Sequence, residues 1–269
     1  MGYDMVEYEL PPSIHLVWLG SPLPDRYLPG PHSLARLNPG MYYYILYIIT
    51  NLSYYYLDHT VHLWVDRVPD NIQDMDNIKI HDINKEVWTT QDMLDQSTNY
   101  AMKTDILRLE IIYKYGGIYV DVDSTALRSF GPVFSTSFLI FRPANWTAKD
   151  KIFSQIQPRK NKIGSAGIEN NIFGFPANSN FLKYALAVLR ENFPLQTATL
   201  YRTGPVFLKE VFLQFPFSHH IPLVSWDYAG SDGEHSVVVD LPGNADWDDD
   251  QDIRRNKATV VTINNNNII

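Results

Sequence analysis

The sequence predicts an α/β fold in which a largely parallel sheet is layered against helices. Short apolar segments rich in β-branched residues alternate along the 269-residue chain with longer segments of helical periodicity. Such alternation is typical of parallel sheets, because each return to the same edge of the sheet needs a crossover. With 45% hydrophobic residues the chain can bury a sizeable core, and we expect one domain over residues 1–269.

The expected strands share β-branched and aromatic residues and end at turn-forming residues. We expect strands over residues 13–20, 61–66, 77–83, 118–123 and 137–142. After Gly20, the proline-rich segment 21–31 predicts a loop.

Three segments have apolar residues at the spacing of an amphipathic helix. Gly116 can supply a left-handed cap for the first, and Asn178 or Ser179 an N-cap for the second. The apolar stripe of the first is Met102, Ile106, Leu109 and Tyr113. The three helices are expected within residues 90–115, 178–193 and 204–215.

Composition excludes several classes of function. A net charge of −8 argues against nucleic acid as a partner, because phosphate contacts need a basic surface. The chain has no cysteine, so disulfides, thiolate metal sites and cysteine nucleophiles are excluded. Any metal must be held by oxygen or by histidine. The Asn-rich residues 252–269 predict a partly disordered tail.

Residues 41–57, MYYYILYIITNLSYYYL, are the most apolar and aromatic part of the chain. Polar Thr50, Asn51 and Ser53 interrupt them, and they fall short of the ~20 apolar residues that a spanning helix needs. A buried or surface-packed element is therefore favoured, and contact with a membrane surface is the alternative.

Asp121 and Asp123 follow the apolar residues 118–120. Residues two apart in a strand share a face, and open α/β sheets bind ligands at the carboxyl ends of strands. Neighbouring carboxylates repel each other unless a cation lies between them or one is protonated. The pattern therefore favours a Mg²⁺ or Mn²⁺ site of the kind that bridges phosphates. The alternative is a pair of turn-forming or helix-capping residues.

Asp105 and Arg108 lie three positions apart on the preceding helix and are neighbours on its surface. One interpretation is a surface ion pair, worth under ~1 kcal/mol. The other is a pair that binds hydroxyl groups near the end of the next strand, because Gly116 and Gly117 allow a close return of the chain.

Taken together, these motifs resemble the glycosyltransferase family whose sugar-binding region contains the D-x-D motif. The resemblance is carried by SIHLVWLGSPLP (13–24) and KTDILRLEIIYKYGGIYVDVDS (103–124), with ENNIFGFPANSNFL (169–182) and TGPVFL (203–208) adding to it. That family includes yeast-type mannosyltransferases, the lactosylceramide galactosyltransferase type and clostridial glucosylating toxins. The resemblance implies a GT-A-like fold and a metal-dependent, retaining glycosyltransferase.

The resemblance also implies a role for each matching residue. Trp18 matches the tryptophan that stacks on the nucleotide base. Asp105 and Arg108 match the pair that holds hydroxyls of the donor sugar. Asp121 matches the carboxylate that contacts the ribose, the sugar and metal-bound water, and Asp123 the ligand of Mn²⁺, or Mg²⁺, on the diphosphate.

Further matches lie towards the C-terminus. Asn171 matches an asparagine near the donor sugar, and Asn170 is the alternative. Thr203-Gly204-Pro205 resembles a turn of the family, although Pro205 at a first helical position explains it without any chemistry.

The third metal ligand is expected at Asp248, because Trp247 matches a loop tryptophan that closes over the diphosphate and some relatives carry histidine next to it. An aspartate suits Mn²⁺ equally well. The alternative ligands are His219, His220 and His235.

These implications predict transfer from a UDP-sugar to a protein acceptor, as in a toxin or effector. The alternative is a GDP-mannose or UDP-galactose enzyme that builds a glycan or glycolipid. A hypothesis of another class is an inactive sugar-nucleotide-binding or lectin-like module. Because no signal-peptide pattern or spanning helix is evident, we expect a cytoplasmic protein, or an effector delivered to a host cytosol by a non-classical route.

Overall fold

The computed structural model describes residues 10–38, 59–70, 72, 77–130, 136–142, 167–195, 198–226 and 238–240. The aromatic segment 41–57 and the expected tail 252–269 lie outside these residues. Of the helices that the described residues form, none combines the length and the apolar character needed to span a bilayer.

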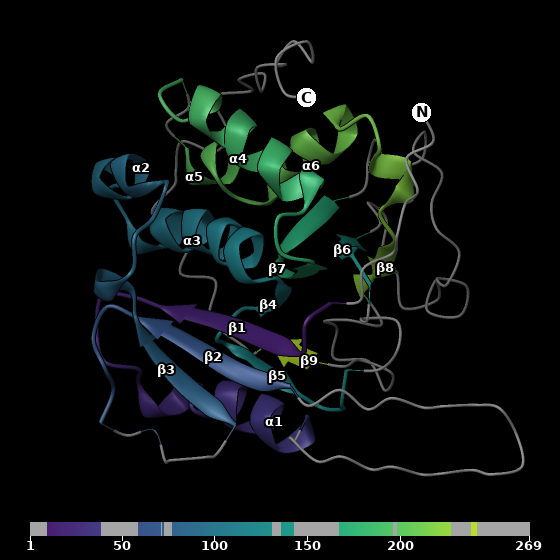
Figure 1. Cartoon of the computed structure of the whole chain (residues 1–269). Coiled ribbons are helices and arrows are strands. Elements are labelled where there is room, and N and C mark those ends of the chain that lie inside the picture. Colours follow the sequence, from purple (N-terminus) through teal and green to yellow (C-terminus); the bar gives the residue numbers. More distant parts are fainter. Residues whose placement is uncertain are drawn as a thin grey trace, which may run out of the picture.

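A seven-stranded sheet lies at the centre of the described structure (Figure 1). Its strands are β1 (Ser13–Trp18), β2 (Thr60–Val65), β3 (Ile78–Asp82), β4 (Gly117–Val120), β6 (Phe138–Arg142), β7 (Gly167–Phe175) and β8 (Leu223–Ser225). Their order across the sheet is β3-β2-β1-β4-β7-β6-β8. Neighbouring strands are parallel, except that β7 runs antiparallel to both β4 and β6. The predicted α/β fold with a largely parallel sheet is confirmed.

A second, two-stranded sheet follows β4 in the chain. It pairs β5 (Ser124–Ala126) with β9 (Val238–Asp240) in antiparallel register. The segment directly after Asp123 is therefore held by backbone pairing with a strand from the C-terminal part of the chain.

Helices cover both faces of the large sheet. They are α1 (Pro29–Leu37), α2 (Gln91–Gln96), α3 (Tyr100–Tyr115), α4 (Asn180–Asn192), α5 (Thr199–Arg202) and α6 (Pro205–Gln214). In Figure 1, α1 lies on one side of the sheet, whereas α3, α4, α5 and α6 lie on the other.

Each face of the sheet has its own hydrophobic core. Leu16 and Val65 belong to the buried cluster that includes Leu34 of α1. Val17 and Trp64 belong to the cluster formed with α3, α4 and α6. Because both faces are covered, the central parallel strands are largely apolar along their whole length.

The single helix expected within 90–115 is in fact two helices. Ser97 Oγ donates a 2.7 Å hydrogen bond to the Met93 carbonyl where α2 ends. The side chain of Asn99 then accepts a 2.8 Å hydrogen bond from the Met102 amide, which caps the start of α3. These short polar side chains bond locally to the backbone and so end one helix and begin the next.

The loop expected over 21–31 is also partly wrong. It contains a short 3₁₀ helix, Asp25–Tyr27, and the first turn of α1. Pro29 stands at the first position of α1, where its fixed φ favours a helix and its missing amide hydrogen costs nothing.

Gly116 and Gly117 make the return from α3 to β4. Gly116 ends α3 and donates its amide to the Ile112 carbonyl at 2.9 Å. Its φ of +69° is positive as predicted, but its ψ of −177° is extended, so the cap is not the left-handed one expected. Gly117 has φ +102°, and a Cβ there would collide with the Ser13 carbonyl oxygen of β1. The double glycine thus lets β4 lie directly against β1.

Candidate active site

Helix α3 carries Asp105 and Arg108 into the interior of the protein. The interpretation of the two as a surface ion pair is wrong, because Asp105 is 0% exposed and Arg108 only 4%. The apolar stripe through Met102, Ile106 and Leu109 is buried as predicted. Other apolar side chains flank the stripe and are buried too, so α3 packs on nearly all sides and its charged residues share that burial.

Arg108 lies between two carboxylates at the end of β4. Its Nη2 is 3.3 Å from Asp105 Oδ1, and its Nη1 is 3.0 Å from Asp121 Oδ1. Nη1 also donates to the Asn170 carbonyl at 2.6 Å, and the guanidinium carbon lies 4.5 Å from the centre of the Tyr119 ring. Arginine suits this place, because its planar fork can serve several acceptors while it stacks on an aromatic face.

Both oxygens of Asp105 have partners inside the protein. Oδ1 accepts a 2.8 Å hydrogen bond from Asn170 Nδ2, and Oδ2 accepts a 2.9 Å hydrogen bond from Thr203 Oγ1. Burial raises the pKa of Asp105 to about 6, opposed by Arg108 and by the two hydrogen bonds. In this arrangement Asp105 orients Arg108, and the expected contact of Asp105 with sugar hydroxyls stays a prediction.

Asp121 and Asp123 lie in a turn after β4 rather than in the strand. The strand ends at Val120, and the Ser124 amide donates a 3.0 Å hydrogen bond to the Asp121 carbonyl. The expected strand over 118–123 is therefore too long, and the shared strand face on which the metal prediction rested does not exist. Both aspartates are half-buried, however, so each retains access to solvent.

The side chain of Asp121 is 25% exposed and joins the network around Arg108. Its Oδ1 accepts a 2.7 Å hydrogen bond from the hydroxyl of Tyr119, a fully buried residue. Burial raises the pKa of Asp121, while Arg108 and Tyr119 lower it. Asp123 lies near enough for its charge to favour the protonated Arg108.

These two aspartates fit a hard divalent cation that keeps other ligands. Mg²⁺ and Mn²⁺ prefer carboxylate oxygens, and Mg²⁺ is commonly held by one or two carboxylates together with substrate phosphates and waters. Within the described ranges no three His, Asp or Glu side chains gather as a metal site. Further ligands would thus come from phosphate, water or residues outside the described ranges, where Asp248, Trp247 and His235 lie. His219 and His220 are exposed in a 3₁₀ turn after α6.

The two candidate asparagines lie where β7 departs from regular pairing. Leu139 of β6 pairs with Phe173, whereas the next residue, Ile140, pairs with Glu169. Residues 170–172 therefore form a bulge in the pairing with β6, although Ile172 still pairs with Val120 of β4. The bulge places Asn170 against Asp105 and Arg108. The backbone carbonyl of Asn171 accepts a 2.8 Å hydrogen bond from the Asp121 amide. The side-chain Oδ1 of Asn171 is buried without a hydrogen-bond partner.

Trp18 is the last residue of β1 and is half-buried. Its indole N–H donates a 3.0 Å hydrogen bond to the Ser21 carbonyl, and its ring centre lies 4.8 Å from that of Tyr27. These contacts fix one edge of the Trp18 indole at the rim of the core, which is compatible with stacking of the ring on a ligand. The expected role in binding the nucleotide base stays a prediction.

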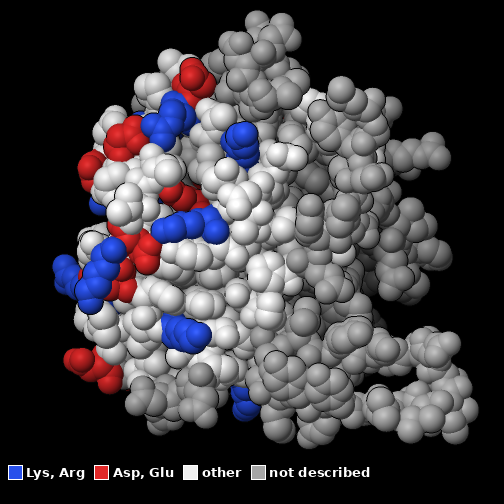
Figure 2. Space-filling view, viewed as in Figure 1, with Lys and Arg blue, Asp and Glu red and all other residues white. Residues whose placement is uncertain are grey.

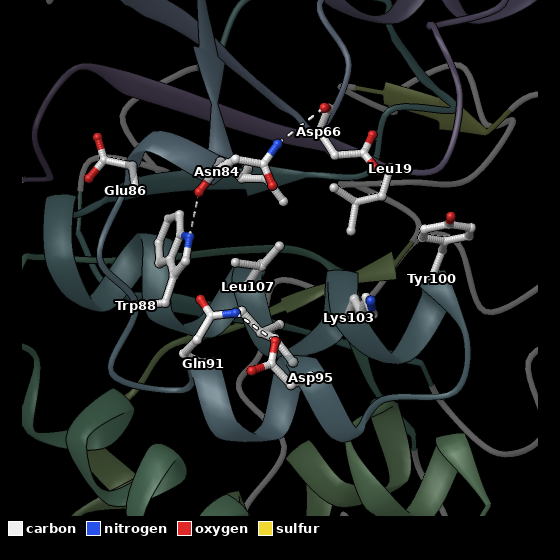
Figure 3. Close-up of a pocket in the computed structure, with 12 residues that line it drawn as sticks. Leu19, Asp66, Asn84, Glu86, Trp88, Gln91, Asp95, Tyr100, Lys103 and Leu107 are labelled. Carbon is white, nitrogen blue, oxygen red and sulfur yellow. Dashed lines mark hydrogen bonds between the residues drawn. The ribbon is translucent and has the colours of Figure 1, made fainter.

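A cavity of about 280 Å³ opens at the carboxyl ends of β1, β2 and β3 (Figure 3). Asp66, after β2, accepts the Gly20 amide with both carboxylate oxygens at 3.0 and 2.9 Å. Tyr100 of α3, 51% exposed, and Lys103 line the same cavity from the opposite wall. Figure 2 shows acidic and basic side chains interspersed on this side, over α2 and the strand ends.

Sequence reasoning missed several contributors to the site. Tyr119 has the pattern of strand core, and Asp66 that of the end of a strand. Pro205 explains the Thr-Gly-Pro turn without a role for the side chain of Thr203. No local pattern signals these roles, because each depends on a contact with a residue far away in the chain.

The comparisons with known proteins agree with this geometry. Residues 33–153 match the family model described as "Glycosyltransferase sugar-binding region containing DXD motif", a span that includes Asp105, Arg108, Asp121 and Asp123. This part of the chain is similar to that glycosyltransferase family.

Two proteins similar to this chain come from a yeast and a bacterium. "Inositol phosphoceramide mannosyltransferase 3" of Schizosaccharomyces pombe is 26% identical over 219 residues, 78% of this chain and 47% of the relative. "Subversion of eukaryotic traffic protein A" of Legionella pneumophila is 28% identical over 130 residues, 44% of this chain and 17% of the relative. The chain thus spans less than half the length of each.

A solved structure of PaToxG glycosyltransferase has a similar fold. The TM-score is 0.52 at 16% identity, covering 77% of this chain and 70% of that one. The likeness concerns the fold alone, and the expected GT-A-like fold is confirmed.

Proposed function

We propose that the chain transfers a sugar from a nucleotide-sugar donor to an acceptor with the help of Mn²⁺ or Mg²⁺. The observation that carries this proposal is the network of Asp105, Arg108 and Asp121. This network holds the buried guanidinium of Arg108 beside the D-x-D turn. The turn lies in the part of the chain that matches the glycosyltransferase family model. Removing an arginine and two acids from water costs free energy, and such buried charged groups are concentrated at functional sites.

The diphosphate of the donor would lie at the D-x-D turn. Asp123 and Asp121 would hold the metal, which when bound neutralises the negative charge that develops on the departing diphosphate. Arg108 contributes a positive charge at a fixed position in a partly desolvated site, where such a charge acts more strongly than in water. No acid–base residue is needed for this part of the reaction.

The nucleoside would lie between Trp18 and the cavity bordered by Asp66 and Tyr100. Support comes from the position of both at the carboxyl edge of the parallel strands, where open α/β sheets bind nucleotides. Trp18 would offer a rigid aromatic face to the base. Asn171, with its buried unpartnered Oδ1, is a candidate to receive a hydroxyl of the sugar.

We propose retention of anomeric configuration. The acceptor hydroxyl forms the new bond to the anomeric carbon while the bond from that carbon to the phosphate oxygen breaks. The proton of the hydroxyl passes to the departing phosphate. The acceptor therefore attacks from the same side as the leaving group, and we assign no protein base.

Two pairs of donor and acceptor follow from the relatives. The name of the Schizosaccharomyces pombe relative supports mannose, from GDP-mannose, and an inositol phosphoceramide acceptor. The name of the Legionella pneumophila relative supports an effector-like protein, consistent with the predicted UDP-sugar, protein acceptor and cytosolic location. The first match covers more of this chain, and we place the mannose donor first for that reason.

A hydrolysis screen tests the proposal and separates the donors. The chain is incubated with GDP-mannose, UDP-glucose, UDP-galactose or UDP-N-acetylglucosamine, with Mn²⁺ or with EDTA, and released sugar is measured. We expect one donor to be hydrolysed only with metal. A chain that binds a donor but never turns it over, even with inositol phosphoceramide or a protein lysate as acceptor, would be a binding module instead.

A further inference from the structure

The hydroxyl of Thr203 belongs to the candidate site although Thr203 lies far from Asp105 in the sequence. Thr203 lies between α5 and α6, and its Oγ1 donates a 2.9 Å hydrogen bond to Oδ2 of Asp105, 98 positions earlier in the chain. Both residues are buried, with Thr203 2% exposed. Pro205 at the start of α6 accounts for the turn that follows, but it does not account for this hydroxyl.

The local backbone holds Thr203 in that position. The amides of Thr203 and Gly204 both donate to the Thr199 carbonyl at 3.0 Å. The Thr199 hydroxyl accepts a 3.2 Å hydrogen bond from Asn99, the residue that caps α3. The turn between α5 and α6 is therefore fastened to the N-terminal end of the helix that carries Asp105.

The Thr203 hydroxyl has one proton and two acceptors within reach. The Thr199 carbonyl lies 3.3 Å away, farther than Asp105 Oδ2 at 2.9 Å. The carboxylate is also the stronger acceptor, because hydrogen bonds to charged groups are shorter and stronger than neutral ones. The proton of Thr203 is therefore directed at Asp105.

This hydrogen bond decides how Arg108 is shared between two acids. Asp105 and Asp121 both contact the same guanidinium, through Nη2 and Nη1. Thr203 supplies Oδ2 of Asp105 with a donor, and Asn170 supplies Oδ1. Without the Thr203 hydroxyl, a buried carboxylate oxygen would lack a partner, and Arg108, which already pairs with Asp105, could turn towards it.

We propose that Thr203 is a positioning residue for sugar transfer, whose hydroxyl fixes Asp105 so that Arg108 stays directed at Asp121. This inference rests on the proposed function, because the effect on the reaction is exerted through Arg108 at the donor site. It assigns to the Thr-Gly-Pro turn a task beyond beginning a helix.

The test compares Thr203→Val, which removes the hydroxyl at nearly constant volume, with Thr203→Ser, which keeps it. Thr90→Val is the matched control. The buried Thr90 hydroxyl also donates to a carboxylate on α3, that of Glu110, but neither residue belongs to the candidate site. All variants are assayed for Mn²⁺-dependent hydrolysis of the donor that the wild-type chain turns over, with rates expressed per folded molecule.

We expect Thr203→Val to lower kcat roughly ten-fold while the KM for the donor changes far less, because a misdirected group costs most in the transition state. Thr203→Ser should restore kcat, and Thr90→Val should lower the melting temperature alone. Wild-type kcat in Thr203→Val would overturn the inference. So would failure of serine to rescue, since the methyl group rather than the hydroxyl would then matter.

If Thr203→Val does not fold, Thr203→Cys takes its place. Cysteine has the same shape as serine with a larger sulfur atom, and its thiol is a weak donor, so the contrast between Cys and Ser tests the hydrogen bond. Equal kcat in these two variants would overturn the inference. Failure of the proposed function is a separate result, because it appears as absence of turnover in the wild-type chain.

Discussion

Arg108 and Asp121 form a close ion pair, with Nη1 and Oδ1 3.0 Å apart, at the point where β4 ends and the D-x-D turn begins. Asp105 contacts the same guanidinium from the opposite side at 3.3 Å. One buried cation therefore links the helix before the double glycine to the turn after it. The stability of the domain and the geometry of the candidate site depend on the same three side chains.

Replacement of Arg108 by methionine is expected to destabilise the fold strongly. It would leave two acids without their cation, and breaking a buried pair in this way typically costs about 3–5 kcal/mol. Urea unfolding measures the change. The matched control is Arg190→Met, because Arg190 pairs with Asp92 at 3.2 Å on the surface, where both side chains are about half exposed. That change should cost under ~1 kcal/mol. Equal losses in the two variants would contradict the network.

Trp18→Ala should weaken binding of the donor while the dependence on Mn²⁺ stays the same. The indole at the end of β1 offers no oxygen ligand to a metal, whereas the carboxylates that would hold the metal follow β4. Titration of the nucleotide diphosphate by calorimetry, at several concentrations of Mn²⁺, separates the two effects. If the variant unfolds instead, packing against Tyr27 is the main task of Trp18.

Gly117→Ala should be among the most destabilising conservative changes in the chain. The residue has φ +102°, and the added Cβ would meet the Ser13 carbonyl, so β1 and β4 could not keep their pairing. We expect a loss of roughly 2 kcal/mol or more in urea unfolding. In contrast, a Cβ on Gly167 would find its nearest neighbour at 3.6 Å, so Gly167→Ala should have little effect. Similar losses in both would contradict this account.

Acid should destabilise the protein through His15. The Trp64 indole donates to Nδ1 at 3.1 Å and Nε2 lies 3.0 Å from the Gly116 carbonyl, so the neutral ring is fully bonded and a second proton would face Trp64. Burial, and then the neighbouring His62, lower the pKa of His15 from 6.5 to about 3. The unfolded chain binds this proton near pH 6.5, so stability is lost as the pH falls from there towards 3.

At pH 5 the loss of unfolding free energy caused by His15 amounts to about 2 kcal/mol. The raised pKa of Asp105 acts in the opposite direction, because the folded state binds that proton first as the pH falls through about 6. Comparison of His15→Gln with the wild type isolates the histidine. The loss of unfolding free energy between pH 7.5 and pH 5 should be smaller in His15→Gln, and unchanged in His219→Gln, which alters an exposed residue. A wild-type pH dependence in His15→Gln would contradict the assignment.

Local sequence patterns predicted most of the strands and the helices α4 and α6, because apolar periodicity reflects which face is buried. They failed where a distant contact decides the outcome. The first half of β7 is polar, and its residues are placed by the bulge beside Asp105 and Arg108. Arg108 itself looked exposed, since a charged residue on a helix is usually solvated. Its burial became possible only through Asp121, Asn170 and Tyr119, which the fold brings together.

The candidate site also contains some features that the sequence predicts and others that it does not. The double glycine and the D-x-D residues stand next to each other in the chain, and their proximity could be predicted. A turn at Asp121 was one of the two alternatives, and the sequence could not decide between them, because the length of β4 is set by its pairing with β7. Thr203 and Asp66 reach the site from separate elements. The Thr-Gly-Pro resemblance marks the turn at Thr203 but not the contact of its hydroxyl, and Asp66 gives no signal in the sequence.

The most direct test of the central claim is the Mn²⁺ dependence of nucleotide-diphosphate binding and donor hydrolysis in Asp123→Asn, with Asp92→Asn as the control. Asparagine keeps the size of the side chain but removes the charge that would hold the metal. We predict that Asp123→Asn loses metal-dependent binding and turnover, whereas Asp92→Asn keeps both. Wild-type binding and turnover in Asp123→Asn would contradict the account.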